Sequence, residues 1–129
     1  MGRRPSSGPT DAELEILQAL WTLGPSSVCD VNEAVNLIRP TGYTTTLKHM
    51  QLMIEKGLLT RDEEARPHLY RPGVSREKTQ RKLVRDLLKR AFDGSATQLI
   101  QQALSTQEAS EEDLTEIRQL LDEIEEDRK

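Results

Sequence analysis

A polar stripe runs along the segment 43–56, which we expect to be a helix. Thr44, Lys48, Gln51 and Glu55 recur at intervals of three or four residues, so they share one helix face. Hydroxyl, ammonium and amide groups are donors and acceptors that can bind base edges in the major groove of DNA. A helix N-terminus also directs backbone N–H groups at phosphate. The pattern therefore favours a helix that binds DNA end-on, with a polar, solvent-facing helix as the open alternative.

The side chains that could bind a metal or act in catalysis do not form a recognisable site in the sequence. The single cysteine, Cys29, and the two histidines, His49 and His68, do not have metal-ligand spacing. The sequence contains no glycine-rich phosphate loop and no arrangement of nucleophile, base and orienting group. We therefore expect no metal, no cofactor and no enzymatic activity.

Composition restricts the class of protein further. The chain has 129 residues, of which 31% are charged and 3% are aromatic. These values suit a helical protein with small cores better than an enzyme with a deep pocket. One cysteine cannot form an internal disulfide, which favours a reducing compartment. Because the sequence has neither a membrane-spanning apolar run nor the apolar core of a signal peptide, we expect a cytoplasmic protein.

Charge is distributed unevenly along the chain, although its net value is −4. The segment 39–72 carries six basic and four acidic residues, and the segment 75–92 carries seven and two. The segment 105–129, by contrast, holds three basic and ten acidic residues. A phosphate backbone would bind the basic middle of the chain. Ordinary solvated helix faces explain the same counts equally well.

The elements that position the polar stripe begin after an N-terminal arm. Residues 1–8 lack apolar periodicity, and we expect them to be disordered. A first helix should follow Thr10, because Thr10 and Glu13 have the spacing of a capping box ahead of an apolar pattern. Gly24 and Pro25 should end this helix.

A second helix is expected after residues 26–27, with apolar residues at helical spacing as far as Ile38 and an end in the turn 39–42. The third helix is the segment 43–56 that carries the polar stripe, and Gly57 should end it. Its inward-facing residues should be Thr46, Met50, Met53 and Ile54.

Two short strands are predicted after the third helix. The segments 58–61 and 68–72 have strand-like patterns, and the polar turn 62–66 separates them before Pro67. Three helices followed by a β-hairpin is the element order of a winged helix, which we place at 9–73. The hairpin would be the wing, near the sugar-phosphate backbone or minor groove. Its candidate DNA contacts are Arg61, Arg66 and His68.

The remaining chain, 74–129, is predicted to form three amphipathic helices. They are expected at 75–92, around 99–104 and after Ser110, which has a near capping-box spacing to Asp113. The segment is too short to bury every apolar stripe within one chain. The simplest interpretation is that the stripes pack against a second copy of the chain, and the alternative is that they pack onto the winged helix. The candidate dimerisation residues are Leu83, Leu87, Leu99, Ile100, Leu114, Ile117, Leu120, Leu121 and Ile124. The expected fold class is mainly α with a small β-hairpin, a winged helix-turn-helix plus a C-terminal helical dimerisation segment.

The chain resembles the BlaI/MecI/CopY penicillinase-repressor family of bacterial transcription factors over most of its length, from Pro9 to Glu126. The Tyr-Thr-Thr turn, followed at family spacing by Lys-Gly, is a fairly specific feature. The stretches that carry the resemblance are Pro9–Leu17 with Leu20-Trp21, Tyr43–Thr46, Glu55–Leu59, His68–Tyr70 and Phe92–Ser95.

The resemblance implies a homodimeric repressor whose winged helices bind the two halves of a palindromic operator in double-stranded DNA. It implies that Tyr43, Thr44, Thr45 and Lys48 lie where the recognition helix meets the bases. It also implies control by a membrane-bound sensor metalloprotease that inactivates the repressor by cleavage. With the wing and the rest of the third helix, the candidate DNA-binding residues are Tyr43, Thr44, Thr45, Lys48, Gln51, Lys56, Arg61, Arg66 and His68. A winged-helix protein–protein adaptor without its own operator is the alternative function.

The sequence departs from the family pattern in three places. The copper-responsive members have a cysteine-rich tail, and this tail has no cysteine. The bond cleaved in the β-lactamase regulators joins Asn and Phe, whereas the corresponding bond here is approximately Gln102-Ala103. Lys48 stands where many relatives have threonine, and Leu52 where many have arginine. The operator and the protease specificity therefore need not match those of the relatives.

Overall fold

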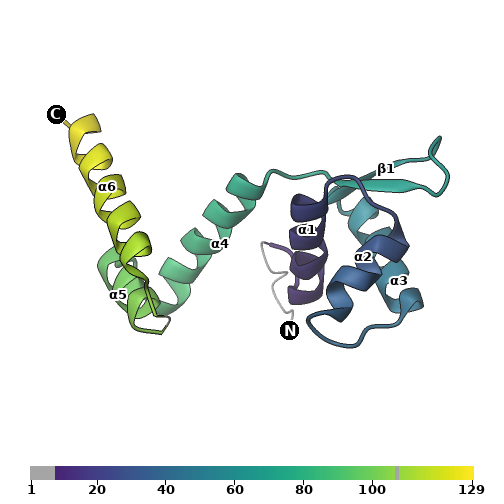
Figure 1. The fold of residues 1–129 in the computed structure, drawn as a ribbon, viewed down its shortest axis with the longest axis horizontal. Coiled ribbons are helices and arrows are strands. Elements are labelled where there is room, and N and C mark those ends of the chain that lie inside the picture. Colours follow the sequence, from purple (N-terminus) through teal and green to yellow (C-terminus); the bar gives the residue numbers. More distant parts are fainter. Residues whose placement is uncertain (1–7, 107) are drawn as a thin grey trace, which may run out of the picture. The chain divides into compact units, whose positions relative to one another are not determined.

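The computed structural model describes residues 8–106 and 108–129. Six helices and two strands follow one another in these ranges (Figure 1). This order confirms the mainly α fold with a small β-hairpin. Of the predicted N-terminal arm, residues 1–7 lie outside the described ranges. The elements are α1 (Asp11–Leu23), α2 (Val28–Asn36), α3 (Tyr43–Glu55), β1 (Leu59–Asp62), β2 (Leu69–Pro72), α4 (Arg76–Ala91), α5 (Ala96–Thr106) and α6 (Glu111–Asp127).

By its internal contacts the chain divides into two units, Met1–Leu83 and Val84–Lys129. We call them the N-terminal and C-terminal units. The border falls inside α4, whose early residue Thr79 is buried while its remaining turns belong to the C-terminal unit. The sequence analysis placed a domain border between residues 73 and 74. That border concerns which parts of the chain fold independently, and it remains a prediction.

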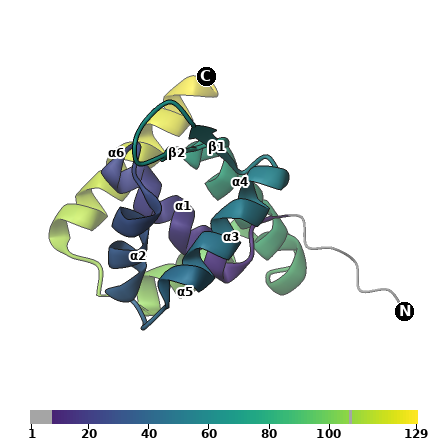
Figure 2. The same cartoon turned by 90° about the vertical axis from the view of Figure 1, so that its right-hand side faces the viewer.

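The core of the N-terminal unit lies among α1, α2, α3 and the hairpin. The three helices pack against one another (Figure 2), and the hairpin contributes one buried side chain from each strand, Leu59 and Tyr70. Burial of these apolar side chains supplies the main driving force for folding. The buried apolar residues are Ile16, Leu17, Leu20, Val28, Val31, Val35, Met50, Met53, Leu59 and Tyr70.

Capping boxes begin both of the first two helices. The N–H of Glu13 donates to Oγ1 of Thr10 at 3.2 Å, and the N–H of Thr10 donates to Oε1 of Glu13 at 2.9 Å. Ser27 and Asp30 repeat this exchange at the start of α2. Each box satisfies backbone donors that a helix N-terminus leaves free. Gly24 ends α1 at φ 83°, a conformation that glycine adopts without steric cost. The predicted start and end of the first helix are confirmed.

The predicted end of the second helix is wrong. Helix α2 stops at Asn36, and Ile38, which was expected on its apolar stripe, is 60% exposed. The physical reason is a competing set of hydrogen bonds. The Asn36 amide binds the backbone N–H and C=O of Thr41, which closes the chain into a turn where the helix would have continued.

The hairpin pairs β1 with β2 in antiparallel register, from Leu59 opposite Pro72 to Asp62 opposite Leu69. Both strands begin one residue later than the sequence pattern suggested. A bridge ties the hairpin to the loop before α2, because the N–H of Tyr70 donates to Ser26 O at 2.8 Å and the N–H of Ser26 donates to Tyr70 O at 3.1 Å. Three packed helices with this attached hairpin form the expected winged helix.

The C-terminal unit consists of the later turns of α4 together with α5 and α6. The capping box of Ser110 and Asp113 begins α6, as its spacing predicted. No described residue of α5 or α6 is buried. This unit therefore has amphipathic helices but no closed core of its own. None of the helices in the described ranges has the length and apolar character needed to span a bilayer.

Candidate nucleic-acid interface

Helix α3 presents two different faces. Thr46, Met50 and Met53 lie in the core of the N-terminal unit. The opposite side is exposed and mostly polar, as the sequence pattern predicted, although Leu52 on α3 is 42% exposed. Its exposed residues include Tyr43, Thr44, Thr45 and Lys48 in the N-terminal half of the helix and Gln51 in the C-terminal half. The packed side fixes the helix, so the exposed side is a rigid surface.

Two asparagines of α2 that the sequence analysis missed hold the start of α3. The Nδ2 of Asn32 donates to Thr41 O at 3.0 Å and to Oγ1 of Thr46 at 2.9 Å. The Nδ2 of Asn36 donates to Thr41 O at 2.8 Å, and its Oδ1 accepts from the N–H of Thr41 at 3.0 Å. We call Asn32, Asn36, Thr41 and Thr46 the turn clamp. The sequence could have revealed this role through the i, i+4 spacing of Asn32 and Asn36, which places both amides on one face of α2.

The N-terminal end of α3 keeps donors available. Gly42 is the N-cap, and no side chain caps the helix there. Within the described ranges, the side chains of Lys48 and Gln51 also have no hydrogen-bond or ion-pair partner. Backbone N–H groups, an ammonium and an amide are therefore free to bind an external acceptor such as a phosphate or a base edge.

The wing is close to the start of α3. Tyr43 of α3 and His68 beside β2 line the same cavity of about 230 Å³, together with Cys29 at the start of α2. His68 is half-buried. The structure therefore brings the predicted contacts of the wing base and the recognition helix onto neighbouring surfaces. No group of three or more histidine, cysteine or acidic residues in the described ranges is placed to hold a metal ion.

The wing tip has an internal acidic partner that the sequence analysis did not identify. The guanidinium of Arg61 donates to the carboxylate of Glu63, and that of Arg66 donates to the backbone carbonyl of Glu63. The hydrogen bond from Arg61 lowers the pKa of Glu63, and the same contact raises the pKa of Arg61. Both predicted wing arginines are thus engaged within the wing itself. Any DNA contact through them must displace or share Glu63.

Lys56 lies at the other end of α3 with a partner inside the protein. Its Nζ is 2.7 Å from Oε2 of Glu13, whose side chain is 5% exposed, while the Lys56 side chain is 52% exposed. Burial alone would raise the pKa of Glu13, but the hydrogen bonds from Lys56 and the Thr10 backbone N–H lower it below its usual value. This pair joins the C-terminal end of α3 to the first turn of α1.

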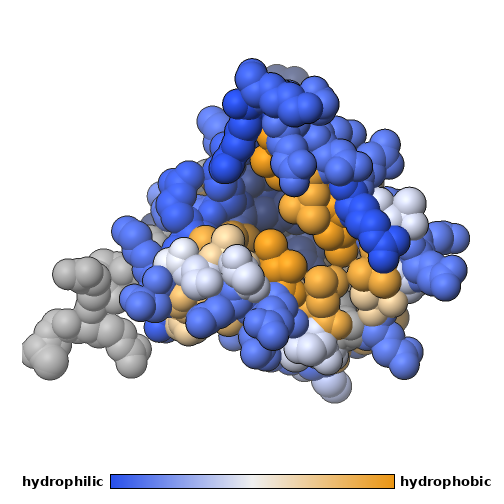
Figure 3. All heavy atoms as spheres, turned by 90° about the vertical axis from the view of Figure 1, so that its left-hand side faces the viewer, coloured by the Kyte–Doolittle hydropathy of each residue, from blue (hydrophilic) through white to orange (hydrophobic). Residues whose placement is uncertain are grey.

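The candidate dimerisation residues lie on α4, α5 and α6. Leu83 belongs to the N-terminal unit, and the others belong to the C-terminal unit. Figure 3, which faces the side where α5 and α6 lie, shows apolar side chains gathered in a hollow. On α6, Leu120 and Leu121 are 54% and 50% exposed. Large apolar side chains exposed in a contiguous group mark an interaction surface.

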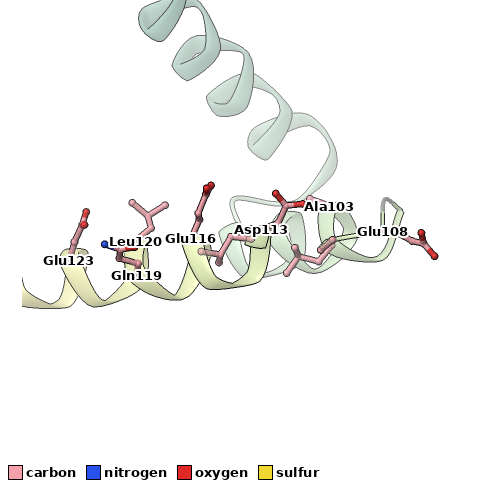
Figure 4. A pocket seen from close by; sticks show the side chains of 10 residues that line it. Ala103, Glu108, Asp113, Glu116, Gln119, Leu120 and Glu123 are labelled. Atoms are coloured by element: carbon pink, nitrogen blue, oxygen red, sulfur yellow. The ribbon is translucent and has the colours of Figure 1, made fainter. Parts of the chain in front are cut away.

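A groove of about 690 Å³ lies between α5 and α6 within the C-terminal unit. Figure 4 shows side chains of its lining, including Leu120 and Ala103 among several carboxylates. The lining of the groove therefore combines apolar side chains with acidic ones. The lining carboxylates are Glu108, Asp113, Glu116 and Glu123.

Comparison with known proteins gives consistent results. The sequence model of the penicillinase repressor family matches residues 9–123. The chain is 27% identical over 117 residues to a penicillinase repressor of Bacillus licheniformis, covering 88% of this chain and 89% of that protein. It is 30% identical over 89 residues to the transcriptional regulator BlaI of Mycobacterium tuberculosis, covering 68% of this chain and 64% of that protein.

A solved structure of Bordetella bronchiseptica BpsR, described as showing how 6-hydroxynicotinic acid regulates its DNA binding, superposes with a TM-score of 0.46 and 21% identity. The superposition covers 95% of this chain and 78% of that one, and it is too weak to support an inference. The family match, by contrast, spans the winged helix and nearly all of the C-terminal helices. The chain belongs to the penicillinase repressor family and is a BlaI-type transcriptional repressor.

Proposed function

We propose that this repressor binds a palindromic operator as a homodimer, with α3 in the major groove and the wing beside the sugar-phosphate backbone. The observation that carries the proposal is the N-terminal half of α3. There Thr44, Thr45 and Lys48 are exposed on a helix fixed by its buried face and by the turn clamp, and Gln51 is exposed in the next turn. A rigid helix with unused donors at its N-terminal end suits direct contact with base edges.

The DNA-binding proposal is tested by selecting bound duplexes from a random pool and measuring affinity for the selected site and a scrambled site. Lys48→Ala should cost about 1–3 kcal/mol on the selected site and relax the preference at one base pair in each half-site, because a lysine donates to guanine O6 and N7. Lys129→Ala removes the same charge from the C-terminal end and should leave both affinities unchanged. Equal weakening on both DNAs would make Lys48 a phosphate contact. Failure to enrich any sequence would favour the adaptor function instead.

The homodimer proposal rests on the uncovered apolar side chains of the C-terminal unit. Helices α5 and α6 have no buried residue in the described ranges, and their exposed apolar residues include Ile100, Leu104, Leu120, Leu121 and Ile124. A second copy would remove these side chains from water at about 25 cal/mol per Å² of apolar surface. A two-fold dimer also explains why a palindromic operator is expected, since two identical winged helices bind two identical half-sites.

Sedimentation velocity tests the dimer. Leu121→Asp should give a monomer and greatly weakened operator binding, because it buries an unpaired charge in the interface. Thr115→Asp adds the same charge on the opposite side of α6, where we expect solvent, and should leave the dimer intact. A Leu121→Asp protein that sediments as the wild type does would exclude α6 from the interface.

We also propose that a membrane-bound sensor metalloprotease controls the repressor by cleavage near the Gln102-Ala103 bond. Both residues are exposed, but the bond lies inside α5, where the C=O of Gln102 accepts from the hydroxyls of Ser105 and Thr106. Proteases act on extended chain, so the last turns of α5 must unwind before cleavage. Incubation with the cognate protease followed by mass spectrometry should give fragments that meet within α5. Fragments that meet elsewhere would exclude this bond.

A further inference from the structure

A cavity of about 540 Å³ opens in the N-terminal unit, away from the polar face of α3. Apolar side chains form much of its wall, namely those of Pro9, Leu58, Val74 and Leu83. Lys56 and Lys82 also line it. Its volume lies within the range of about 300–1,000 Å³ that is usual for small-molecule sites. An apolar wall with a few charged groups is the usual composition of such a site.

The charges that line this cavity leave one positive charge uncompensated. Lys56 is paired with Glu13, which also lines the cavity. Lys82 has no ion-pair partner within the described ranges. Since an ammonium has three donors and Lys56 gives one to Glu13, both lysines that line the cavity retain donors for a ligand. The electrostatics of the cavity therefore match a monoanion.

We propose that this cavity binds a small hydrophobic monocarboxylate. The carboxylate would accept hydrogen bonds from Lys82 and Lys56, and the hydrocarbon part would pack against Leu58, Val74 and Leu83. A phosphodiester fits poorly, because an apolar wall does not solvate a chain of charged and polar groups. A cation fits poorly, because Glu13 is already neutralised by Lys56. All these residues belong to the N-terminal unit.

A natural reporter lies beside the cavity. Trp21 is the single tryptophan of the chain, and its Nε1 donates to the carbonyl of Val74 at 3.4 Å. Because Val74 lines the cavity, an occupant should change the emission of Trp21. Titration of the full-length protein with cyclohexanecarboxylate should give a saturable change. The neutral alcohol cyclohexylmethanol has the same ring without the charge and should bind at least about tenfold more weakly.

Two matched variants test the assignment of the anion to Lys82. Lys82→Gln should weaken cyclohexanecarboxylate about tenfold, because it removes a charge-assisted hydrogen bond. Lys78→Gln makes the same change one turn earlier on α4, outside the cavity lining, and should leave the Kd within about twofold, because solvent and salt screen distant charges. Equal affinity for acid and alcohol, equal effects of the two variants, or no saturable response of the wild type would each overturn the proposal.

Discussion

The ion pair between Lys56 and Glu13 leads to a prediction about stability. Lys56→Met removes the ammonium and keeps an unbranched apolar stem of similar length. Hydrogen bonds to charged groups contribute about 1.5–3 kcal/mol when buried, whereas exposed ion pairs contribute about 0–1 kcal/mol. The Glu13 side chain is 5% exposed but that of Lys56 is 52% exposed. We therefore expect Lys56→Met to lower the free energy of unfolding by about 1–2 kcal/mol at neutral pH.

The loss should depend on pH with a definite sign. The folded-state pKa of Glu13 lies below the ordinary value of a glutamate carboxyl. A carboxyl whose pKa is lowered by folding stabilises the protein above its unfolded pKa, and this contribution is lost as the pH falls through the folded pKa. Lys56→Met removes two of the causes that lower the pKa and leaves the burial that raises it. The stability difference between wild type and variant should therefore be full at neutral pH and shrink as the pH falls through the titration range of the Glu13 carboxyl.

Urea unfolding followed by circular dichroism measures this difference at neutral pH and at about pH 3.5, at equal protein concentrations because the proposed dimerisation would couple to stability. Lys48→Met is the matched control, since it makes the same change on α3 at a lysine with no partner within the described ranges. It should cost little at either pH. The reasoning is refuted if Lys56→Met unfolds as the wild type does. If such a variant also loses DNA affinity, Lys56 is a DNA contact, as the sequence analysis predicted, and its contact with Glu13 contributes little.

Two further variants test the N-terminal unit. Asn32→Ala should lower the free energy of unfolding by about 1–2 kcal/mol, because the buried hydroxyl of Thr46 loses its donor and the carbonyl of Thr41 keeps only that of Asn36; an unchanged urea midpoint would show that the turn clamp is not a stabilising feature. Gly73→Ala should cost about 1–3 kcal/mol, because its Cβ would lie 2.7 Å from the carbonyl oxygen of Gly57, a backbone atom. A thermal melt equal to that of the wild type would show that the hairpin shifts freely.

The sequence predicted features that depend on neighbouring residues. The capping boxes at Thr10 and Ser110 and the hairpin between 58 and 72 require short-range patterns, and the structure contains all of them. The buried side of α3 was also predictable, because apolar periodicity directly reflects burial. The same periodicity also predicts the exposed face of α3 that is proposed to bind DNA, because this face lies opposite the buried one.

Features that depend on distant partners were not predictable. Lys56 and Glu13 are 43 positions apart, so periodicity placed Lys56 on a surface without revealing its partner. The apolar pattern continued to Ile38 after the helix had ended, because side-chain hydrogen bonds of Asn36, not hydrophobicity, decide where α2 stops. The wing arginines show the same limit at short range. Composition counts charges, but it does not show that Arg61 and Glu63 neutralise each other.

The contact between Arg61 and Glu63 means that the wing carries its own counterion. A phosphate neutralised by a free arginine releases condensed cations, which adds about 0.9 to the salt exponent of binding. A phosphate that takes Arg61 from Glu63 gains a guanidinium but also a neighbouring carboxylate, so the pair brings no net positive charge to the DNA. The net release is therefore smaller than the number of basic residues suggests. If the wing binds DNA as proposed, its affinity should therefore be less sensitive to salt than that of a wing with unpaired arginines.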